Sequence, residues 1–156
     1  MEKTNVMRLL DSKKINYKVL KSTLDPAINS AEDFAIDVGI GSDRMYKTLV
    51  TEAKSKKNYV FVIPADKELD LKKCAKAVGE KSIEMVKSRL LLELTGYVHG
   101  GCSPFMMKKL FTTVIYCDAL NQDAIVINAG RIGSLIEIKT EDISKIIKVK
   151  FDDVCT

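Results

Sequence analysis

The chain of 156 residues has no tryptophan, one histidine and three prolines, and its four cysteines stand far apart. A zinc site normally shows paired ligands such as C-x₂-C, which this sequence lacks. No apolar run approaches the roughly 18 residues that a membrane span requires, and the N-terminus has no apolar signal-peptide core. These absences argue against a zinc ribbon, a disulfide scaffold and a membrane protein. They favour a single cytoplasmic domain over residues 1–156, with reduced cysteines.

The charge of the chain is mildly basic, with 25 Lys and Arg residues against 21 Asp and Glu residues, a net +4. Arginine is scarce and aromatic residues make up only 6% of the chain, whereas base-reading proteins carry more of both. Lysines are point charges that suit phosphate backbones. The composition therefore fits either a solvated lysine-rich surface or contact with an anionic partner.

Hydrophobic periodicity predicts six or seven strands and about five helices in irregular alternation. The expected strands cover residues 17–23, 45–53, 59–63, 83–86, 113–117, 124–128 and 135–138. Ser30 and Asp33 resemble a capping box, and Ser88 and Thr140 are the expected caps of two later helices. Glycine-rich dinucleotide or P-loop fingerprints are missing. The pattern predicts an α/β (α+β) fold, in which a mixed, curved sheet is surrounded by helices.

The common catalytic sets are absent from the sequence. No serine sits in a G-x-S-x-G elbow, so a Ser-His-Asp triad would depend on His99. Cys74 and Cys117 follow apolar patterns and behave as small hydrophobes, while Cys102, in the segment Gly100–Pro104, is a poor nucleophile candidate without a base beside it. The sequence therefore shows no paired metal ligands, and Cys102 is a poor nucleophile candidate, while a small-molecule hydrolase that uses His99 is a remote alternative.

Two segments differ from ordinary core or surface sequence. Lys47 enters a predicted strand between Tyr46 and Thr48, and a lysine directed into a sheet pocket is costly unless it meets an anion. The adjacent glycines Gly100 and Gly101 allow close backbone approach to a ligand and can direct N–H groups at an oxygen. A solvent-facing lysine and a tight loop are the alternatives. A weaker segment, 128–133, contains two glycines in a predicted hairpin turn.

Taken in order, these segments resemble the YbaK/EbsC-type aminoacyl-tRNA deacylases, relatives of the editing insertion domain of bacterial prolyl-tRNA synthetase. The resemblance covers nearly the whole chain. The motifs that carry it are Lys47-Thr48-Leu49, Leu69-Asp70-Leu71-Lys72-Lys73, Thr95-Gly96-Tyr97, Gly100-Gly101-x-Ser103-Pro104, Lys108-Lys109, and Gly130-x-x-Gly133 ahead of Ile136-Glu137-Ile138. It implies a mixed, partly barrel-like sheet and no metal or cofactor.

The resemblance also implies a free-standing editing enzyme that hydrolyses mischarged aminoacyl-tRNA, chiefly Cys-tRNA(Pro), with prolyl-tRNA synthetase as a further partner. Lys47 would anchor the 3′ end of the tRNA, and Gly100 and Gly101 would hold the ester. The implied substrate-binding residues are Tyr46, Thr48, Ser103, Pro104, Gly130 and Gly133. The nucleophile would be the thiol of the substrate's own cysteine.

The sequence departs from the family pattern at two places. The stretch 22–31, which ends at Ala31, lacks the bulkier residues that often line the pocket. Leu135 stands where many members carry an aspartate, and Arg131 is displaced by one position. These departures bear on amino-acid specificity. They keep open the alternative of a non-catalytic module that binds aminoacyl-tRNA or a nucleotide.

Overall fold

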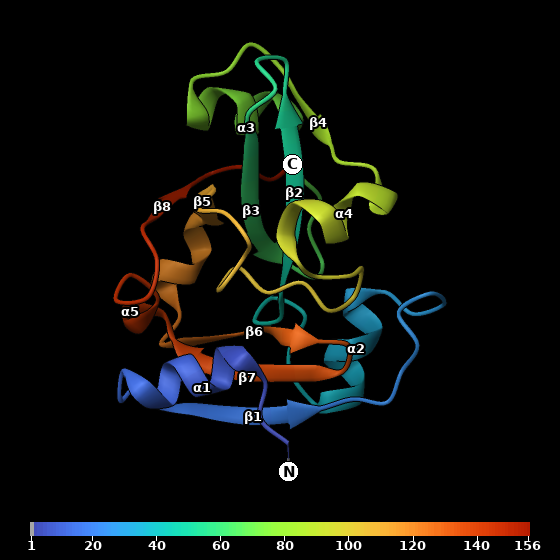
Figure 1. Cartoon of the computed structure of the whole chain (residues 1–156), viewed down its shortest axis with the longest axis vertical. Coiled ribbons are helices and arrows are strands. Elements are labelled where there is room, and N and C mark those ends of the chain that lie inside the picture. The colour runs from blue at the N-terminus through green and yellow to red at the C-terminus, as the bar shows by residue number, and fades with distance from the viewer. Residues whose placement is uncertain (1) are drawn as a thin grey trace.

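The computed structural model describes residues 2–156, and Met1 lies outside the described residues (Figure 1). The α-helices are α1 (Asn5–Ser12), α2 (Ala31–Val38), α3 (Leu71–Val78), α4 (Ser88–Thr95) and α5 (Thr140–Ile143). The strands are β1 (Tyr17–Lys21), β2 (Tyr46–Ala53), β3 (Asn58–Pro64), β4 (Ile83–Met85), β5 (Thr112–Tyr116), β6 (Ala124–Arg131), β7 (Ser134–Lys139) and β8 (Val149–Asp152). None of these helices is long and apolar enough to cross a membrane.

The mixed α+β architecture is confirmed, but the strands form two sheets instead of one. The smaller sheet is antiparallel in the order β1-β7-β6, and the larger one is mixed in the order β4-β2-β3-β5-β8. A bridge between Met45 and Val126 connects them. Residues 2–156 thus contain eight strands, not six or seven. β8 was missed because its sequence, VKFD, alternates apolar and polar residues over only four positions, which is a short signal for a strand.

Local capping explains where several helices begin and end. Ser30 and Asp33 form the predicted capping box of α2, with each side chain accepting from the other residue's backbone N–H. Gly39, Gly79 and Gly96 end α2, α3 and α4 in the left-handed conformation. The other two predicted caps are wrong. Ser88 and Thr140 are the first helical residues of α4 and α5, so the capping positions fall one residue earlier.

Three apolar clusters hold the elements together. The largest lies between the two sheets and includes Met7 and Leu10 of α1, which are completely buried. A second cluster packs α3 on the other face of the larger sheet, and a third packs α2 on the smaller sheet. β3 contributes to both faces of its sheet, with Val62 in the first cluster and Phe61 in the second. This confirms the predicted strand at residues 59–63 and shows that both of its faces are covered.

β2 reaches from one sheet to the other, and this placement creates an open stretch of strand edge. β2 pairs with β3 along its length, but it pairs with β4 only at residues 51–53. At its start, Met45 bridges to β6. Between these contacts, residues 46–49 have no strand partner on the side away from β3 in the described structure. An unpaired edge of this kind leaves backbone and side chains available to a ligand.

Candidate functional site

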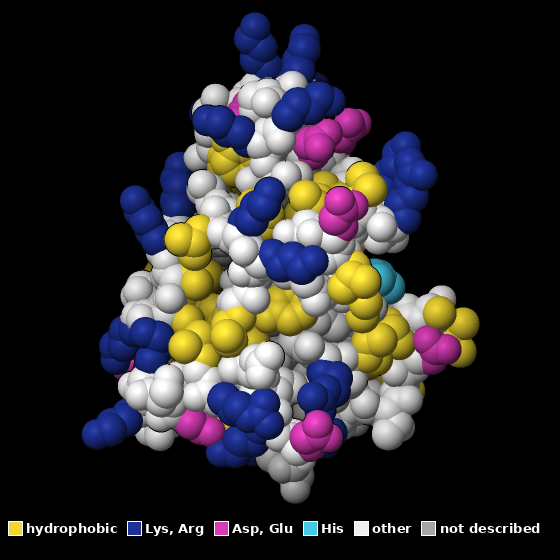
Figure 2. All heavy atoms as spheres, in the orientation of Figure 1, with side chains coloured by type: hydrophobic (Ala, Val, Ile, Leu, Met, Phe, Trp, Pro, Cys, Tyr) yellow, Lys and Arg dark blue, Asp and Glu magenta, His cyan; other side chains and the backbone are white. Residues whose placement is uncertain are grey.

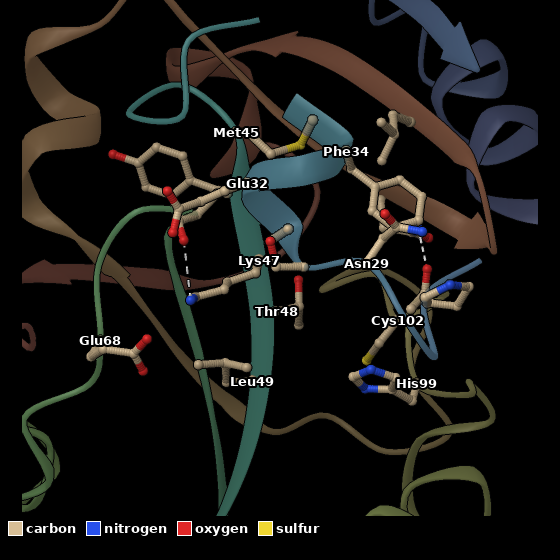
Figure 3. Close-up of a pocket in the computed structure, with 18 residues that line it drawn as sticks. Asn29, Glu32, Phe34, Met45, Lys47, Thr48, Leu49, Glu68, His99 and Cys102 are labelled. Carbon is tan, nitrogen blue, oxygen red and sulfur yellow. Dashed lines mark hydrogen bonds between the residues drawn. The ribbon is translucent and has the colours of Figure 1, made fainter. Parts of the chain in front are cut away.

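A cleft of about 280 Å³ lies along this open edge of β2. Figure 3 shows its residues, which come from β2, the start of α2, the segment after β3 and the loop that follows α4. Four of the predicted site residues line it: Tyr46, Lys47, Thr48 and Gly100. Ala31 and Leu135, the positions of the family departures, also line it. The structure therefore brings together segments that are up to about a hundred residues apart in the chain.

Lys47 presents its ammonium group to the cleft with most of its hydrogen-bonding capacity unused. The Nζ atom donates to the carbonyl oxygen of Ala65 at 3.3 Å (Figure 3). Within residues 2–156, no carboxylate oxygen lies within 4.0 Å of this nitrogen. An ammonium has three N–H donors, so at least one is free for a ligand. The side chain is half-buried, which fits a cation that meets an anion in the cleft and not one that is fully solvated.

The two neighbours of Lys47 carry hydroxyl groups that have no partner. The Tyr46 ring is only 2% exposed and belongs to the largest apolar cluster. Its hydroxyl and the Thr48 hydroxyl are buried without a hydrogen bond in the described structure. Burial, the largest cause, raises the pKa of Tyr46 above its ordinary value, so this hydroxyl stays protonated. Unsatisfied buried polar atoms are costly, and in a cleft wall they indicate positions where a bound molecule can supply the missing bond.

The glycine pair of the predicted ester-binding loop divides into two different environments. Gly100 has φ +81° and lines the cleft, and its carbonyl accepts a hydrogen bond from the Asn128 side chain at 3.0 Å. No acceptor in the described structure takes the Gly100 N–H. The Gly101 N–H, in contrast, donates to the Val98 carbonyl at 3.0 Å. Gly101 is buried, and a Cβ there would lie 2.9 Å from the Ile132 nitrogen. A Cβ on Gly100 would lie 2.4 Å from the Pro26 side chain, so both glycines allow close packing, but only the Gly100 N–H is left without an acceptor.

The rest of this loop is buried and supports its shape. Ser103 is completely buried and its hydroxyl accepts from the Phe105 N–H at 3.1 Å. Pro104 is also buried, and neither residue lines the cleft. Cys102 does line it, but burial raises the pKa of its thiol to about 12. A thiol that stays protonated at neutral pH is a poor nucleophile, which agrees with the expectation from sequence.

The hairpin glycines lie outside the cleft and have structural contacts. Gly130 has φ +96°, and a Cβ there would lie 3.0 Å from the Tyr97 ring. A Cβ on Gly133 would lie 2.1 Å from the Ser22 carbonyl oxygen. The backbone N–H of Ser22 also donates to the Gly133 carbonyl at 2.9 Å. These contacts join the β6–β7 hairpin to its neighbours. Neither glycine lines the cleft that Lys47 and Gly100 share.

Sequence reasoning missed two acidic residues of the cleft, Glu32 and Glu68. Figure 3 shows both carboxylates on the same side of β2 as the Lys47 ammonium. Neither stood out because each lies in an ordinary polar stretch, Glu32 in the first turn of α2 and Glu68 in the segment after β3. His99 also lines the cleft, on the side opposite Lys47 in this view. The cleft therefore offers one cation, two carboxylates and a titratable imidazole.

Comparison with known proteins gives a family that accounts for this cleft. Residues 25–146 match the family described as the aminoacyl-tRNA editing domain, and this span contains every residue that lines the cleft. The chain belongs to this family. It is also similar to a protein of Enterococcus faecalis named as a Cys-tRNA(Pro)/Cys-tRNA(Cys) deacylase, EbsC. The two sequences are 41% identical over 155 residues, which cover 99% of this chain and 94% of the relative.

Two solved structures share the fold. One is titled as a trans-editing enzyme for prolyl-tRNA synthetase, with a TM-score of 0.82, 20% sequence identity, and coverage of 100% of this chain and 99% of that chain. The other is the hypothetical protein APE2540, with a TM-score of 0.87, 20% identity, and coverage of 98% and 100%. At this identity the likeness concerns the arrangement of the elements. It shows that this chain shares its overall fold with both structures.

Proposed function

We propose that this protein is a trans-editing deacylase that hydrolyses the ester between a mischarged amino acid and the terminal adenosine of tRNA, with Cys-tRNA(Pro) as its substrate. The observation that carries the proposal is the unpaired ammonium of Lys47 in an open cleft of an aminoacyl-tRNA editing domain. The similarity to a Cys-tRNA(Pro)/Cys-tRNA(Cys) deacylase supports the choice of amino acid. Prolyl-tRNA synthetase is the corresponding candidate partner, since it would release the mischarged tRNA.

Lys47 anchors the 3′ end in this scheme. The terminal nucleotide carries a phosphate, and an ammonium that lacks a carboxylate partner is a strong donor to phosphate oxygens. The hydrogen bond to Ala65 holds the lysine side chain across the cleft, so less rotamer entropy is lost when the substrate binds. The Thr48 hydroxyl, buried and unpaired beside it, supplies a second polar contact.

Gly100 stabilises the charge that develops on the ester oxygen. Its N–H is open in the cleft, and the hydrogen bond from Asn128 fixes the orientation of the loop. A backbone donor already aligned with a developing oxyanion needs no reorganisation during the reaction. Gly101 contributes through packing, because its own N–H is occupied by Val98. The two adjacent glycines therefore have separate tasks.

The substrate's own thiol is the nucleophile. The thiolate sulfur attacks the carbonyl carbon, the bond from this carbon to the ribose oxygen breaks, and the ribose oxygen takes up a proton. The tRNA leaves with a free hydroxyl, and water then opens the cyclic thioester to give cysteine. An aminoacyl ester is already activated, so positioning alone can supply much of the rate. A thiolate is also a far better nucleophile than the hydroxyl of serine near neutral pH.

The acidic residues suit the free α-amino group of the substrate. This group is protonated over much of the neutral range, and a carboxylate a few ångströms away favours binding of an ammonium. Glu32 and Glu68 are the carboxylates of the cleft, and neither pairs with a cation of the described structure within 4.0 Å. In this arrangement Lys47 binds the nucleotide side of the ester and Glu32 binds the amino-acid side.

Hydrolysis of a panel of charged tRNAs tests the function directly. Purified protein would be mixed with Cys-, Ser-, Ala- and Pro-tRNA, each with the amino acid labelled, and the loss of ester would be followed over time. We expect fast loss of Cys-tRNA only. Tight binding of these tRNAs without loss of any ester would instead support the alternative, a non-catalytic aminoacyl-tRNA or nucleotide-binding module.

A further inference from the structure

A second cavity, of about 270 Å³, lies beside the start of α1 and is lined by three cationic side chains. These are Arg8 of α1, Lys108 of the loop after α4, and Arg131 at the tip of the β6–β7 hairpin. No aspartate or glutamate is among the described residues that line it. Figure 2 shows Lys and Arg side chains over the lower part of this face, where α1 lies, separated by a band of hydrophobic side chains from a group at the opposite end.

The charges of these three cations are poorly neutralised. The Arg8 guanidinium donates to the Asn5 side chain at 3.1 Å, a neutral acceptor. The carboxylate nearest to Arg131 is that of Glu2, 3.9 Å away, and the Glu2 side chain is 78% exposed. Lys108 has no carboxylate within 4.0 Å in residues 2–156. Cations that converge on a hollow repel one another and together attract an anion, so this cavity is suited to a negatively charged group.

The second cavity and the main cleft are lined by adjacent residues of the same hairpin. Asn128 lines the main cleft, and the next residues, Ala129, Gly130 and Arg131, line the cavity, where the register of β6 and β7 shifts. The loop after α4 divides in the same way, with His99 in the cleft and Tyr97 in the cavity. A chain-like ligand that leaves one site therefore needs only to cross the hairpin tip to reach the other.

The crossing point carries apolar surface. Val98 and Ile132 lie in the chain between residues of the two sites, and they are 44% and 45% exposed. They belong to segments that touch, since Gly101 is packed directly against the backbone of Ile132. Exposed apolar side chains next to a cationic hollow match a nucleotide strand, which alternates apolar base faces with anionic phosphates.

We infer that the cavity formed by Arg8, Lys108 and Arg131 binds a backbone phosphate of the RNA strand whose 3′ end occupies the main cleft. This inference rests on the proposed function. Arginine is well suited to the role because its planar fork of N–H donors matches phosphate oxygens. The ligand is a phosphodiester of the unpaired acceptor end, and bases stack over Val98 and Ile132 as the strand passes the hairpin tip. The site adds affinity for tRNA and takes no part in breaking the ester.

Binding of uncharged tRNA tests this site without any use of the activity. The triple variant Arg8→Gln, Lys108→Gln and Arg131→Gln would be compared with wild type and with the charge-matched control Lys18→Gln, Lys109→Gln and Lys139→Gln. The control residues are exposed, and Lys109 is the direct neighbour of Lys108. We expect the cavity variant to lose tenfold or more in affinity and its log K against log salt slope to fall by about one, because the cavity binds one phosphate. The control variant should change the affinity and the salt slope by no more than a third of the change seen for the cavity variant.

A minimal substrate distinguishes failure of this inference from failure of the proposed function. An aminoacyl ester of adenosine without further phosphates fills only the main cleft, so wild type and the cavity variant should hydrolyse it equally. Equal weakening of tRNA binding by both triple variants, or unchanged binding by the cavity variant, would overturn the inference. So would competition by inorganic phosphate at low millimolar concentration, which would indicate a free-anion site. Each single variant gives the same comparison if the triple variant has a lowered melting temperature. Absence of hydrolysis on every substrate would count against the deacylase proposal alone.

Discussion

Replacement of Lys47 by methionine is the sharpest test of the cleft. The change keeps most of the side-chain length and removes the charge, and its effect on stability should be small. Lys47 makes one hydrogen bond to the protein, to Ala65 at 3.3 Å, and the open cleft lets water take over this carbonyl. The loss is therefore about 1 kcal/mol at most, which corresponds to a fall of about 2–4 °C in melting temperature.

The effect on activity should be much larger. If the ammonium anchors the 3′ end in the transition state, its removal costs roughly 3 kcal/mol, or two orders of magnitude in kcat/KM. The assay is single-turnover deacylation of Cys-tRNA, with Lys47→Ala as a second variant and Lys18→Met as the control. Lys18 is an exposed lysine of β1 that does not line the cleft. Activity of either Lys47 variant within threefold of wild type, with normal melting, would remove this residue from the mechanism.

Four further predictions follow from the site and its surroundings. Cys-tRNA should be cleaved at least a hundredfold faster than Ser-tRNA, and comparable rates on both substrates would favour a water nucleophile. Replacement of all four cysteines of the enzyme should leave most of the activity. Glu32→Gln should raise KM for Cys-tRNA about tenfold and have no effect on the N-acetylated substrate, which lacks the ammonium; a uniform effect on both would argue for a packing role. Because burial raises the pKa of Cys102 to about 12, its thiol stays protonated as pH rises through 8. Mass spectrometry should therefore show that iodoacetamide at pH 8 labels Cys102 only after the protein is unfolded. Gly79→Ala and Gly133→Ala both place alanine at positive φ, but only the Cβ of the second meets another atom, at 2.1 Å. Calorimetry should therefore show that the free energy of unfolding falls by about 1 kcal/mol for Gly79→Ala and by above 3 kcal/mol for Gly133→Ala. Similar losses for the two variants would show that the hairpin shifts freely.

Local sequence was enough to predict most of the elements, because their signals are short-range. The apolar run 59–63 and the capping box at Ser30 depend on residues within a few positions of one another. The unusual position of Lys47 was also visible, since a lysine that enters an apolar strand contrasts with its immediate neighbours. What such signals could not supply was the pairing of strands. β8 is only four residues long, and its parallel pairing with β5 joins residues more than thirty positions apart in the chain.

Tertiary structure alone decided which residues meet Lys47. Glu32 and Glu68 reach the cleft from two different segments, and nothing in their local sequence distinguishes them from ordinary surface residues. It also gave Gly100 and Gly101 different hydrogen bonding, because only the folded loop shows that Val98 accepts the Gly101 N–H while no acceptor in the described structure takes the Gly100 N–H. Hydrophobic periodicity and helix capping reflect interactions between a residue and its neighbours along the chain. Clefts and open strand edges arise where distant segments pack and leave backbone or side-chain groups unpaired, and that balance is set by the whole fold.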